Sequence, residues 1–278
     1  MIFYKSRLDV LPRLKLTKEK KSNFFKKKLL RGSLILLIVL LLAFWGAQRV
    51  GFEPLLILTN LPQALARFIY LYIPPSFAEI DELFTELVTT ILLAISAASV
   101  GAVLAFFSGL AISKVTGKIK FLKVTIRLLA TFIRNVPAAI WAITLLMAFW
   151  FGEFLAFIVM ALSTYGFMTR LFANVIDETN SHSVEALEAT GASYWQIVFQ
   201  AVLPETLPVI ISWALYAVET NIRSATIIGM LAGGGIGYLI GIYRHFRKFN
   251  LLFAAVIFIV ITILITDQIS NQVRKRIL

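Results

Sequence analysis

The chain has 278 residues, of which 59% are hydrophobic and only 15% are charged, and its mean hydropathy is +0.84. A soluble protein of this length has too little interior to hide so much apolar surface, so the composition predicts one integral membrane domain without a second soluble domain. The net charge of +12 does not indicate a nucleic-acid-binding surface, because its largest block is a basic N-terminal tail, residues 1–31.

The basic tail predicts which side of the membrane the N-terminus occupies. Runs such as "KEKKSNFFKKK" beside a first apolar segment stay in the cytoplasm, where they contact anionic lipid. The apolar run that follows, 33–47, comes after too long a basic region for a secretory signal and precedes no clear cleavage pattern, so it is expected to be a retained anchor. Residues 32–278 are therefore predicted to form the transmembrane domain.

Six apolar segments approach or exceed the ~20 residues that a helix needs to cross ~30 Å of hydrocarbon. They are 32–48, 84–112, 124–150 (broken by Pro137), 153–172, 206–226 and 249–268. This all-α arrangement puts the basic segments 114–123 and 274–276 inside, and the acidic loop 51–82 outside.

The basic segment 243–249 breaks that charge rule, because six spans leave it outside. A seventh span over the glycine-rich residues 227–242 would bring it inside but push 274–276 outside. We therefore keep six spans. In either count the segment 183–204 stays on the cytoplasmic side, since it precedes the disputed residues.

Segment 183–204 carries the signals of two short helices joined at a glycine. Ser183 is expected to cap the first helix, and Gly191 permits the left-handed turn that ends it. Ser193 and Gln196 have the spacing of a capping box for the second helix, which Pro204 is expected to break. Such a pair, with exposed aromatic side chains, suits docking into a groove of another protein, although an amphipathic loop on the membrane surface fits the residues equally.

The same segment resembles the EAA loop of bacterial ABC importer permeases, which forms the coupling helix in a cleft of the ATP-binding subunit. Two departures are mild: Leu187 replaces the family's second alanine, and Ala201 replaces its usual isoleucine. The residues that carry the resemblance, and hence the expected ATPase-coupling role, are Glu185, Ala186, Gly191, Leu203 and Pro204.

Three further stretches resemble the permease subunit of phosphonate importers, a subfamily that also handles phosphite and related oxyanions. They are "PPSFAEIDELFTELVTTILLAIS", "ETNIRSATIIGMLAGGGIG" and "ITDQISNQVRK", and the likeness covers roughly residues 70–276. It implies a type I ABC importer permease with about six transmembrane helices, in the bacterial inner membrane.

The resemblance also implies partners. They are two copies of an ATP-binding subunit, which hold ATP and Mg²⁺, and a solute-binding protein on the outer side. One coupling loop per chain and two ATP sites favour a homodimer, embedded in lipid and without nucleic acid. The chain itself is expected to bind no cofactor and to catalyse no reaction.

Ionisable and polar groups inside the spans are candidates for the substrate path, because charges at membrane depth need partners. Glu219 and Arg223 are four residues apart and can pair on one helix face. They either lock that helix or, near the outer mouth, help to guide an oxyanion. Arg127 is expected to snorkel at the cytoplasmic edge. The full set of path candidates is Arg134, Glu219, Asn221 and Arg223, with a structural role left open for each charge.

The glycine run near residue 235 has two interpretations. Glycines at a loop end are often turn-formers, but they also permit a re-entrant hairpin that moves against its copy as a gate. The gate candidates are Gly233, Gly234, Gly235 and Gly237. His182 and His245 have no ligand spacing, so no metal site is predicted.

The function expected from the sequence is import of phosphonate or a related oxyanion, such as phosphite or a phosphate ester, by an ATP-driven importer. One alternative is an ABC importer permease for another solute, such as methionine or phosphate. A secondary transporter is a further alternative, but it would predict an inverted repeat and an ion-relay carboxylate, and neither is evident.

Overall fold

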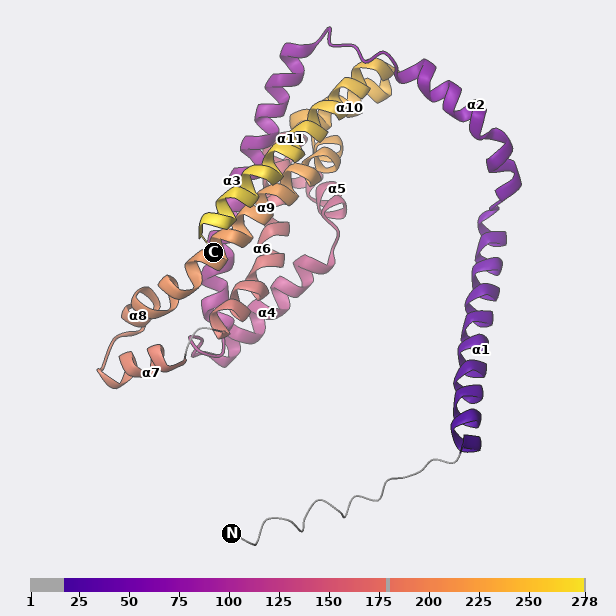
Figure 1. The fold of residues 1–278 in the computed structure, drawn as a ribbon. Coiled ribbons are helices and arrows are strands. Elements are labelled where there is room, and N and C mark those ends of the chain that lie inside the picture. Colours follow the sequence, from indigo (N-terminus) through magenta and orange to yellow (C-terminus); the bar gives the residue numbers. More distant parts are fainter. Residues whose placement is uncertain (1–17, 179–180, 278) are drawn as a thin grey trace. The chain divides into compact units, whose positions relative to one another are not determined.

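The computed structural model describes residues 18–178 and 181–277, and every regular element in these ranges is a helix (Figure 1). The all-α fold class is therefore confirmed. Internal contacts divide the chain at Arg67 into two units. The first contains helix α1 (Lys18–Val50), which runs without interruption past residue 31, and most of α2 (Pro54–Tyr72). Residues 1–17 of the basic tail lie outside the described part of the chain.

The second unit is a bundle built on four long helices. These are α3 (Ile80–Ile112), α6 (Glu153–Asp177), α9 (Leu203–Ala232) and α11 (Phe249–Ile277). The shorter elements are α4 (Lys120–Asn135), α5 (Ala138–Phe149), α7 (Ser181–Ala189), α8 (Tyr194–Ile197), a π-helical turn (Val198–Val202) and α10 (Gly235–His245).

Six helical segments of the described chain are long and apolar enough to cross a membrane, and five of them contain predicted spans. The predicted span 124–150 instead consists of α4 and α5, which meet at a bend of 101°. Pro137 explains the break, because its ring disfavours helical geometry in the preceding residue, and Val136 is indeed extended, with ψ 120°. The pair is either one broken span or a re-entrant element.

The sixth segment is α2, which lies where the sequence predicted an external loop. The predicted loop was wrong over Pro54–Tyr72, which forms a 19-residue helix, while its place outside the membrane stays a prediction. Two prolines and several polar residues gave the segment a loop-like composition. Pro54 occupies the first helical position, however, where a proline is tolerated, and the Leu- and Ala-rich remainder favours helix.

Helices α3 and α6 form the axis of the bundle by packing small residues against each other. A Cβ atom added at Gly101 would lie 2.7 Å from Thr164 Cβ, and one at Gly109 would lie 3.1 Å from Phe172 Cβ. Small residues allow helix backbones to approach closely, which is how helices associate when lipid is the solvent. The α3–α6 pair therefore provides the fixed frame for the other elements.

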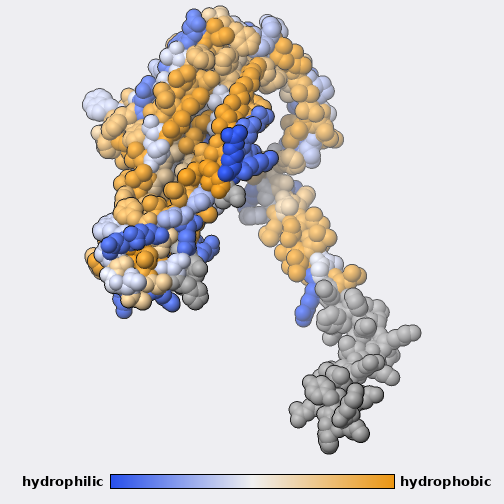
Figure 2. Space-filling model, turned by 60° about the vertical axis from the view of Figure 1, so that its left-hand side comes forward, coloured by the Kyte–Doolittle hydropathy of each residue, from blue (hydrophilic) through white to orange (hydrophobic). Residues whose placement is uncertain are grey.

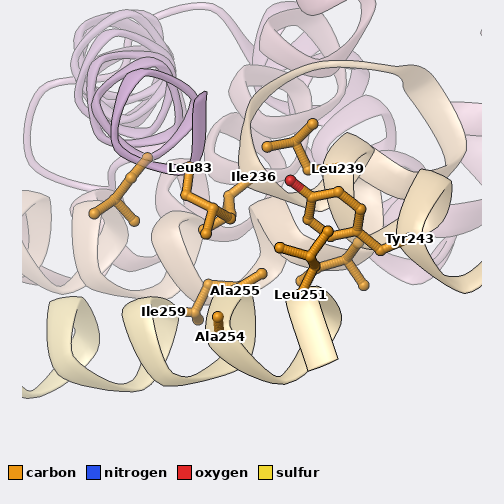
Figure 3. Packing of buried hydrophobic residues seen from close by; sticks show 10 residues of the cluster. Leu83, Ile236, Leu239, Tyr243, Leu251, Ala254, Ala255 and Ile259 are labelled. Carbon is orange, nitrogen blue, oxygen red and sulfur yellow. The ribbon is translucent and has the colours of Figure 1, made fainter. Parts of the chain in front are cut away.

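Helix α10 packs between α3 and α11, and the three helices share one hydrophobic cluster (Figure 3). Leu83 of α3 meets Ile236, Leu239 and Tyr243 of α10 and a row of small and branched residues of α11. Lys248 Nζ, just after α10, lies 3.0 Å from Glu79 Oε1, just before α3. The basic segment after α10 thus lies where α3 begins, and residues 227–242 do not form a seventh span.

Large apolar side chains remain exposed along the bundle, as Figure 2 shows for one face. On α11, for example, Leu264 is 57% exposed and Ile265 is 52% exposed. A surface of this kind is stable only against lipid. It agrees with the composition, which already required an apolar solvent.

Candidate functional site

The first candidate site is residues 181–202, which comprise α7, α8 and the π turn that follows and which we call the α7–α8 segment; its helices project from one end of the bundle (Figure 1). Gly191 adopts a left-handed conformation, with φ +78°. Its N–H donates to the Glu188 carbonyl at 3.0 Å, and the Ala192 N–H donates to the Leu187 carbonyl at 3.1 Å. These bonds satisfy the last carbonyls of α7, so Gly191 ends that helix as predicted.

The predicted start of the second helix was confirmed, whereas the predicted start of the first was wrong. The Ser193 N–H donates to Gln196 Oε1 at 2.7 Å, which completes the predicted capping box. Helix α7 begins at Ser181, however, so Ser183 lies inside its first turn rather than at the cap. The side chain of His182 lies outside the described residues.

Pro204 does not break the second helix. The chain is helical from Tyr194 to Ala232 and passes through the π-helical turn 198–202, in which the Leu203 N–H reaches back to the Val198 carbonyl. Pro204 then stands in the first turn of α9, where the N–H that it lacks is not required. A π turn inside an α-helix is a feature that often marks functional sites.

The α7–α8 segment has one anchored face and one open face. Ile197, Val198 and Val202 are buried against Leu110 of α3 and Ile176 of α6. On the open face, Trp195 is 53% exposed and Phe199 is 58% exposed, and their rings stack at 6.0 Å. Of the predicted coupling residues, Glu185, Ala186, Gly191 and Pro204 are also exposed, whereas Leu203 is half-buried.

A carboxylate clasps the two axial helices at this same end, which we call the coupling end. Asp177 Oδ1, the last residue of α6, accepts hydrogen bonds from the Ser113 hydroxyl and the Lys114 N–H, both at 2.6 Å. The ends of α3 and α6 are therefore tied together directly beneath α7–α8.

The second candidate site is a network of paired charges between α9 and α11. Glu219 Oε1 lies 3.1 Å from Arg223, and its other oxygen lies 3.3 Å from Arg274, while Asp267 lies 3.8 Å from Arg223. The predicted pairing of Glu219 with Arg223 is thus confirmed. Arg223 lies beside Asp267 of α11, and its predicted place near an outer mouth stays a prediction.

Asn221 holds three helices together. Its side-chain amide donates to Thr164 of α6 at 3.1 Å and lies 3.5 Å from the Ala94 carbonyl of α3, and the residue is 6% exposed. Hydroxyl side chains, including those of Ser163, Thr220 and Ser224, line a cavity of about 150 Å³ beside it. The residue has a packing function, and its predicted place on a substrate path stays a prediction.

The third candidate site is a cavity of about 290 Å³ between α3, α4 and α6, lined by three arginines. Arg127 Nη2 lies 3.4 Å from the Ile112 carbonyl, and the Arg134 guanidinium lies 5.9 Å from the Phe167 ring centroid. Arg170 of α6 is the third. Within the described chain none of the three forms an ion pair. We call this the arginine cavity.

Only part of the arginine cavity was foreseen from the sequence. Arg134 was a path candidate and Arg127 was placed at the membrane edge, but Arg170 was missed. Its signal was present, since an arginine inside an otherwise apolar span is a functional candidate by default. Its partners on α4 could not be known without the packing of α4 on α6.

The glycine run forms the tight turn between α9 and α10. Gly233, Gly234 and Gly235 have φ values of +81°, +139° and +60°, which side chains rarely adopt. An added Cβ at Gly235 would collide with the Thr90 hydroxyl, and that hydroxyl accepts the Ile236 N–H at 2.8 Å. The predicted turn-forming role is confirmed, while movement of these residues and Gly237 as a gate stays a prediction.

Residues 101–278 match the family described as "Binding-protein-dependent transport system inner membrane component". The chain belongs to this family. It is therefore the permease component of an ABC importer, a multi-pass inner-membrane transport subunit and not an enzyme.

Among curated proteins, two relatives share 28% identity with the permease over about three quarters of its length. They are the phosphate-import permease protein PhnE of Mycolicibacterium smegmatis (208 residues, 74% of this chain and 39% of that protein) and the phosphite transport system permease protein PtxC of Stutzerimonas stutzeri (203 residues, 73% and 74%). The chain thus spans about two fifths of the Mycolicibacterium relative. A probable D-methionine transport system permease protein, MetI of Pasteurella multocida, is 29% identical over 126 residues (45% and 58%).

The fold is also similar to a solved structure of the MetNI methionine ABC transporter in an inward-facing conformation. The match has a TM-score of 0.65 at 19% identity and covers 73% of this chain and 99% of that one. At this identity the likeness bears on the fold alone. It supports the ABC importer permease architecture.

Proposed function

We propose that this permease imports phosphonate or a related oxyanion, such as phosphite or a phosphate ester, and that α7–α8 couples transport to a separate ATP-binding subunit. The observation that carries the coupling proposal is the open face of α7–α8, where Trp195 and Phe199 are exposed beside a clasped helix pair. Exposed aromatic side chains at a projecting helix are typical anchors for a partner's groove. The coupling end then faces the cytoplasm.

That orientation agrees with the basic segments. Three lysines follow α3 at the coupling end: Lys114, Lys118 and Lys120. Helix α11 starts near the beginning of α3 and runs towards the coupling end, where its last turn carries Arg274, Lys275 and Arg276. Positive residues favour the cytoplasmic face. The solute-binding protein would then deliver its cargo at the end where α3 begins.

The coupling path follows from the packing. Closure of two ATPases around ATP and Mg²⁺ would displace α7–α8, which moves α3 and α6 through the Asp177 clasp. It would also tilt α9 through the continuous helix from Tyr194 to Ala232. One coupling segment per chain favours a homodimer with the path along its two-fold axis.

The cargo proposal is supported by the relatives. The two whose names refer to phosphate import and phosphite transport align with about three quarters of the permease, whereas the methionine relative aligns with less than half. Methionine is therefore the second candidate cargo. It is supported by the D-methionine permease relative, which is 29% identical over 126 residues.

The test is the ATPase activity of proteoliposomes that hold the permease, its ATP-binding subunit and its solute-binding protein. We expect methylphosphonate or phosphite to stimulate the activity, with methionine inert. Stimulation by methionine alone would replace the proposed cargo by the second candidate. Failure of any ATP-binding subunit to bind the permease would contradict the coupling proposal.

Trp195→Ala tests the docking surface. Removal of a central aromatic anchor costs an interface about 2 kcal/mol or more, so we expect the affinity for the ATP-binding subunit to fall about 30-fold. The matched control is Phe246→Ala, another exposed aromatic residue, which follows α10 at the other end of the bundle. Equal affinities for the two variants and the native permease would show that α7–α8 is not the docking element.

Glu185→Lys tests the same surface through charge. Glu185 is exposed on α7 and takes part in none of the ion pairs of the described chain, so the variant should insert and fold normally. We expect it to bind cargo-loaded solute-binding protein yet to lose solute-stimulated ATP hydrolysis. Native stimulation in this variant would count against a coupling role for α7.

A further inference from the structure

We propose that the arginine cavity binds a tetrahedral phospho group at the coupling end of the bundle, with Arg127, Arg134 and Arg170 as its ligands. This inference rests on the proposed function, because the imported oxyanion is one of the ligands that would occupy the cavity. Two sources share the required chemistry: an imported oxyanion about to be released, and the head group of an anionic phospholipid.

The cavity is formed by a close approach of two helices. A Cβ atom added at Gly166 of α6 would lie 2.8 Å from the Ile133 side chain and 3.0 Å from the Arg134 backbone nitrogen of α4. Glycine at this position therefore lets α4 reach α6. The approach brings two arginines of α4 and Arg170 of α6 around one space.

The size of the space suits a small hydrated oxyanion. The cavity measures about 290 Å³, and a water molecule occupies about 30 Å³, so an oxyanion fits together with several waters. All three arginines are accessible from outside the permease. The remaining polar lining comes from Thr131 and Asn135.

The charges around the cavity are not compensated by the permease itself. No carboxylate lines it, and the carboxylate that ends α6, Asp177, is already engaged by Ser113 and Lys114. Arginine stays protonated at any accessible pH. Three like charges around one space repel each other, and an anion between them would relieve that repulsion, whereas no carboxylate of the described chain lines the space.

A basic track leads to the cavity from the coupling end. Lys120, Lys123, Arg127 and Arg134 are spaced by three, four and seven residues, so they share one face of α4. A row of one charge sign raises the local concentration of ions of the opposite sign. The track therefore connects the cavity with the side on which the ATPase would dock.

Arginine is also the right side chain for this ligand. Its planar fork donates two parallel hydrogen bonds to two oxygens of one phospho group, which a lysine ammonium cannot match. Arg127 already contacts the carbonyl that ends α3, and Arg134 lies over an aromatic ring. These contacts hold the two guanidinium groups at the rim without neutralising them.

The experiment measures the binding of radiolabelled methylphosphonate to the permease–ATPase complex without its solute-binding protein, in phosphatidylcholine nanodiscs. We expect saturable binding that phosphite and phosphate displace and methionine does not. Loss of one charge-assisted contact should weaken it about tenfold or more in Arg134→Gln and in Arg170→Gln. The matched control, Arg276→Gln, changes an exposed arginine without an ion pair in the described chain and should bind normally.

A second set of nanodiscs, with phosphatidylglycerol added, identifies the source of the phospho group. If the lipid is the natural occupant, it should inhibit methylphosphonate binding and should be retained on the native complex, but not on Arg170→Gln, in native mass spectrometry. If the cargo is the occupant, phosphatidylglycerol should have no effect. Either result supports the site.

The proposal is overturned if neither methylphosphonate nor phosphatidylglycerol binds, or if Arg170→Gln binds both like the native complex. Arg170→Lys separates binding from folding, since it keeps the charge and should restore part of the affinity. Solute-stimulated ATP hydrolysis of the native complex is measured in parallel. Normal stimulation by an oxyanion with an empty cavity refutes only this inference, whereas no stimulation by any oxyanion refutes the proposed cargo.

Discussion

Two groups of charged side chains lie within the helical bundle, and they differ in how their charges are balanced. In the network between α9 and α11, Glu219 and Asp267 face Arg223 and Arg274, so two negative charges meet two positive ones. In the arginine cavity, three positive charges surround an open space, and no carboxylate lines it.

The difference separates a structural network from a candidate ligand site. A charge-balanced network links helices through its ion pairs, and an incoming anion would have to displace an existing carboxylate partner. A cluster of like charges beside an open cavity, in contrast, can accept a ligand of the opposite charge without displacing a residue. The presence of charge in a membrane span is thus a weaker indicator of function than charge without a partner.

Glu219→Gln should have the largest effect on stability. It removes a carboxylate that is 14% exposed and serves both Arg223 and Arg274, so Asp267 alone would face two guanidinium groups. Breaking a buried pair costs about 3–5 kcal/mol, and this partly accessible one should cost about 2–3 kcal/mol. Thermal unfolding of the purified complex measures it, with exposed Glu188→Gln as the control. An unchanged melting temperature would contradict the structural interpretation of the network.

Arg223→Gln should cost less, about 1 kcal/mol, because this arginine is 49% exposed and Glu219 keeps Arg274 as a partner. Uptake per folded complex should stay within about twofold of the native value, since about 1 kcal/mol leaves the folded state dominant. Loss of uptake at an unchanged melting temperature would restore the guiding role that the sequence left open for Arg223.

Glu79→Gln should have the smallest effect on stability, because it breaks a partly exposed ion pair with Lys248. The hydrogen bond from Lys248 holds the pKa of the Glu79 carboxyl below its ordinary value of 4.5. A lowered carboxyl pKa contributes stability above the unfolded pKa and loses it as the pH falls through the folded pKa. Because both side chains are partly exposed, we expect less than about 1 kcal/mol.

Melting temperatures measured at pH 7 and near pH 4 test this contribution. The native complex should lose slightly more stability than Glu79→Gln on acidification. The same pH dependence in both would show that the Glu79–Lys248 pair contributes nothing measurable.

The local signals in the sequence were reliable where one residue determines the backbone. Gly191 tolerates the left-handed turn that ends α7. Gln196 accepts the free N–H of Ser193 at the start of α8, so both features follow from the sequence without tertiary information. The membrane class followed from composition. The pairing of Glu219 and Arg223 followed from helical spacing.

The errors arose where neighbouring structure overrode a local signal. Pro204 usually marks a helix end, but the π turn before it supplies an alternative bonding pattern that carries the helix through. The prolines and polar residues of α2 concealed a helix. Arg170 was missed because its importance depends on Gly166, which allows α4 to approach.

The most direct test measures methylphosphonate binding and thermal unfolding on the same nanodisc preparations of Arg170→Gln and Glu219→Gln. We expect Arg170→Gln to lose about tenfold or more in affinity at a native melting temperature. Glu219→Gln should melt earlier and bind with native affinity while folded. Native binding by Arg170→Gln, or loss of binding by Glu219→Gln at a native melting temperature, would contradict the assignment of the two clusters.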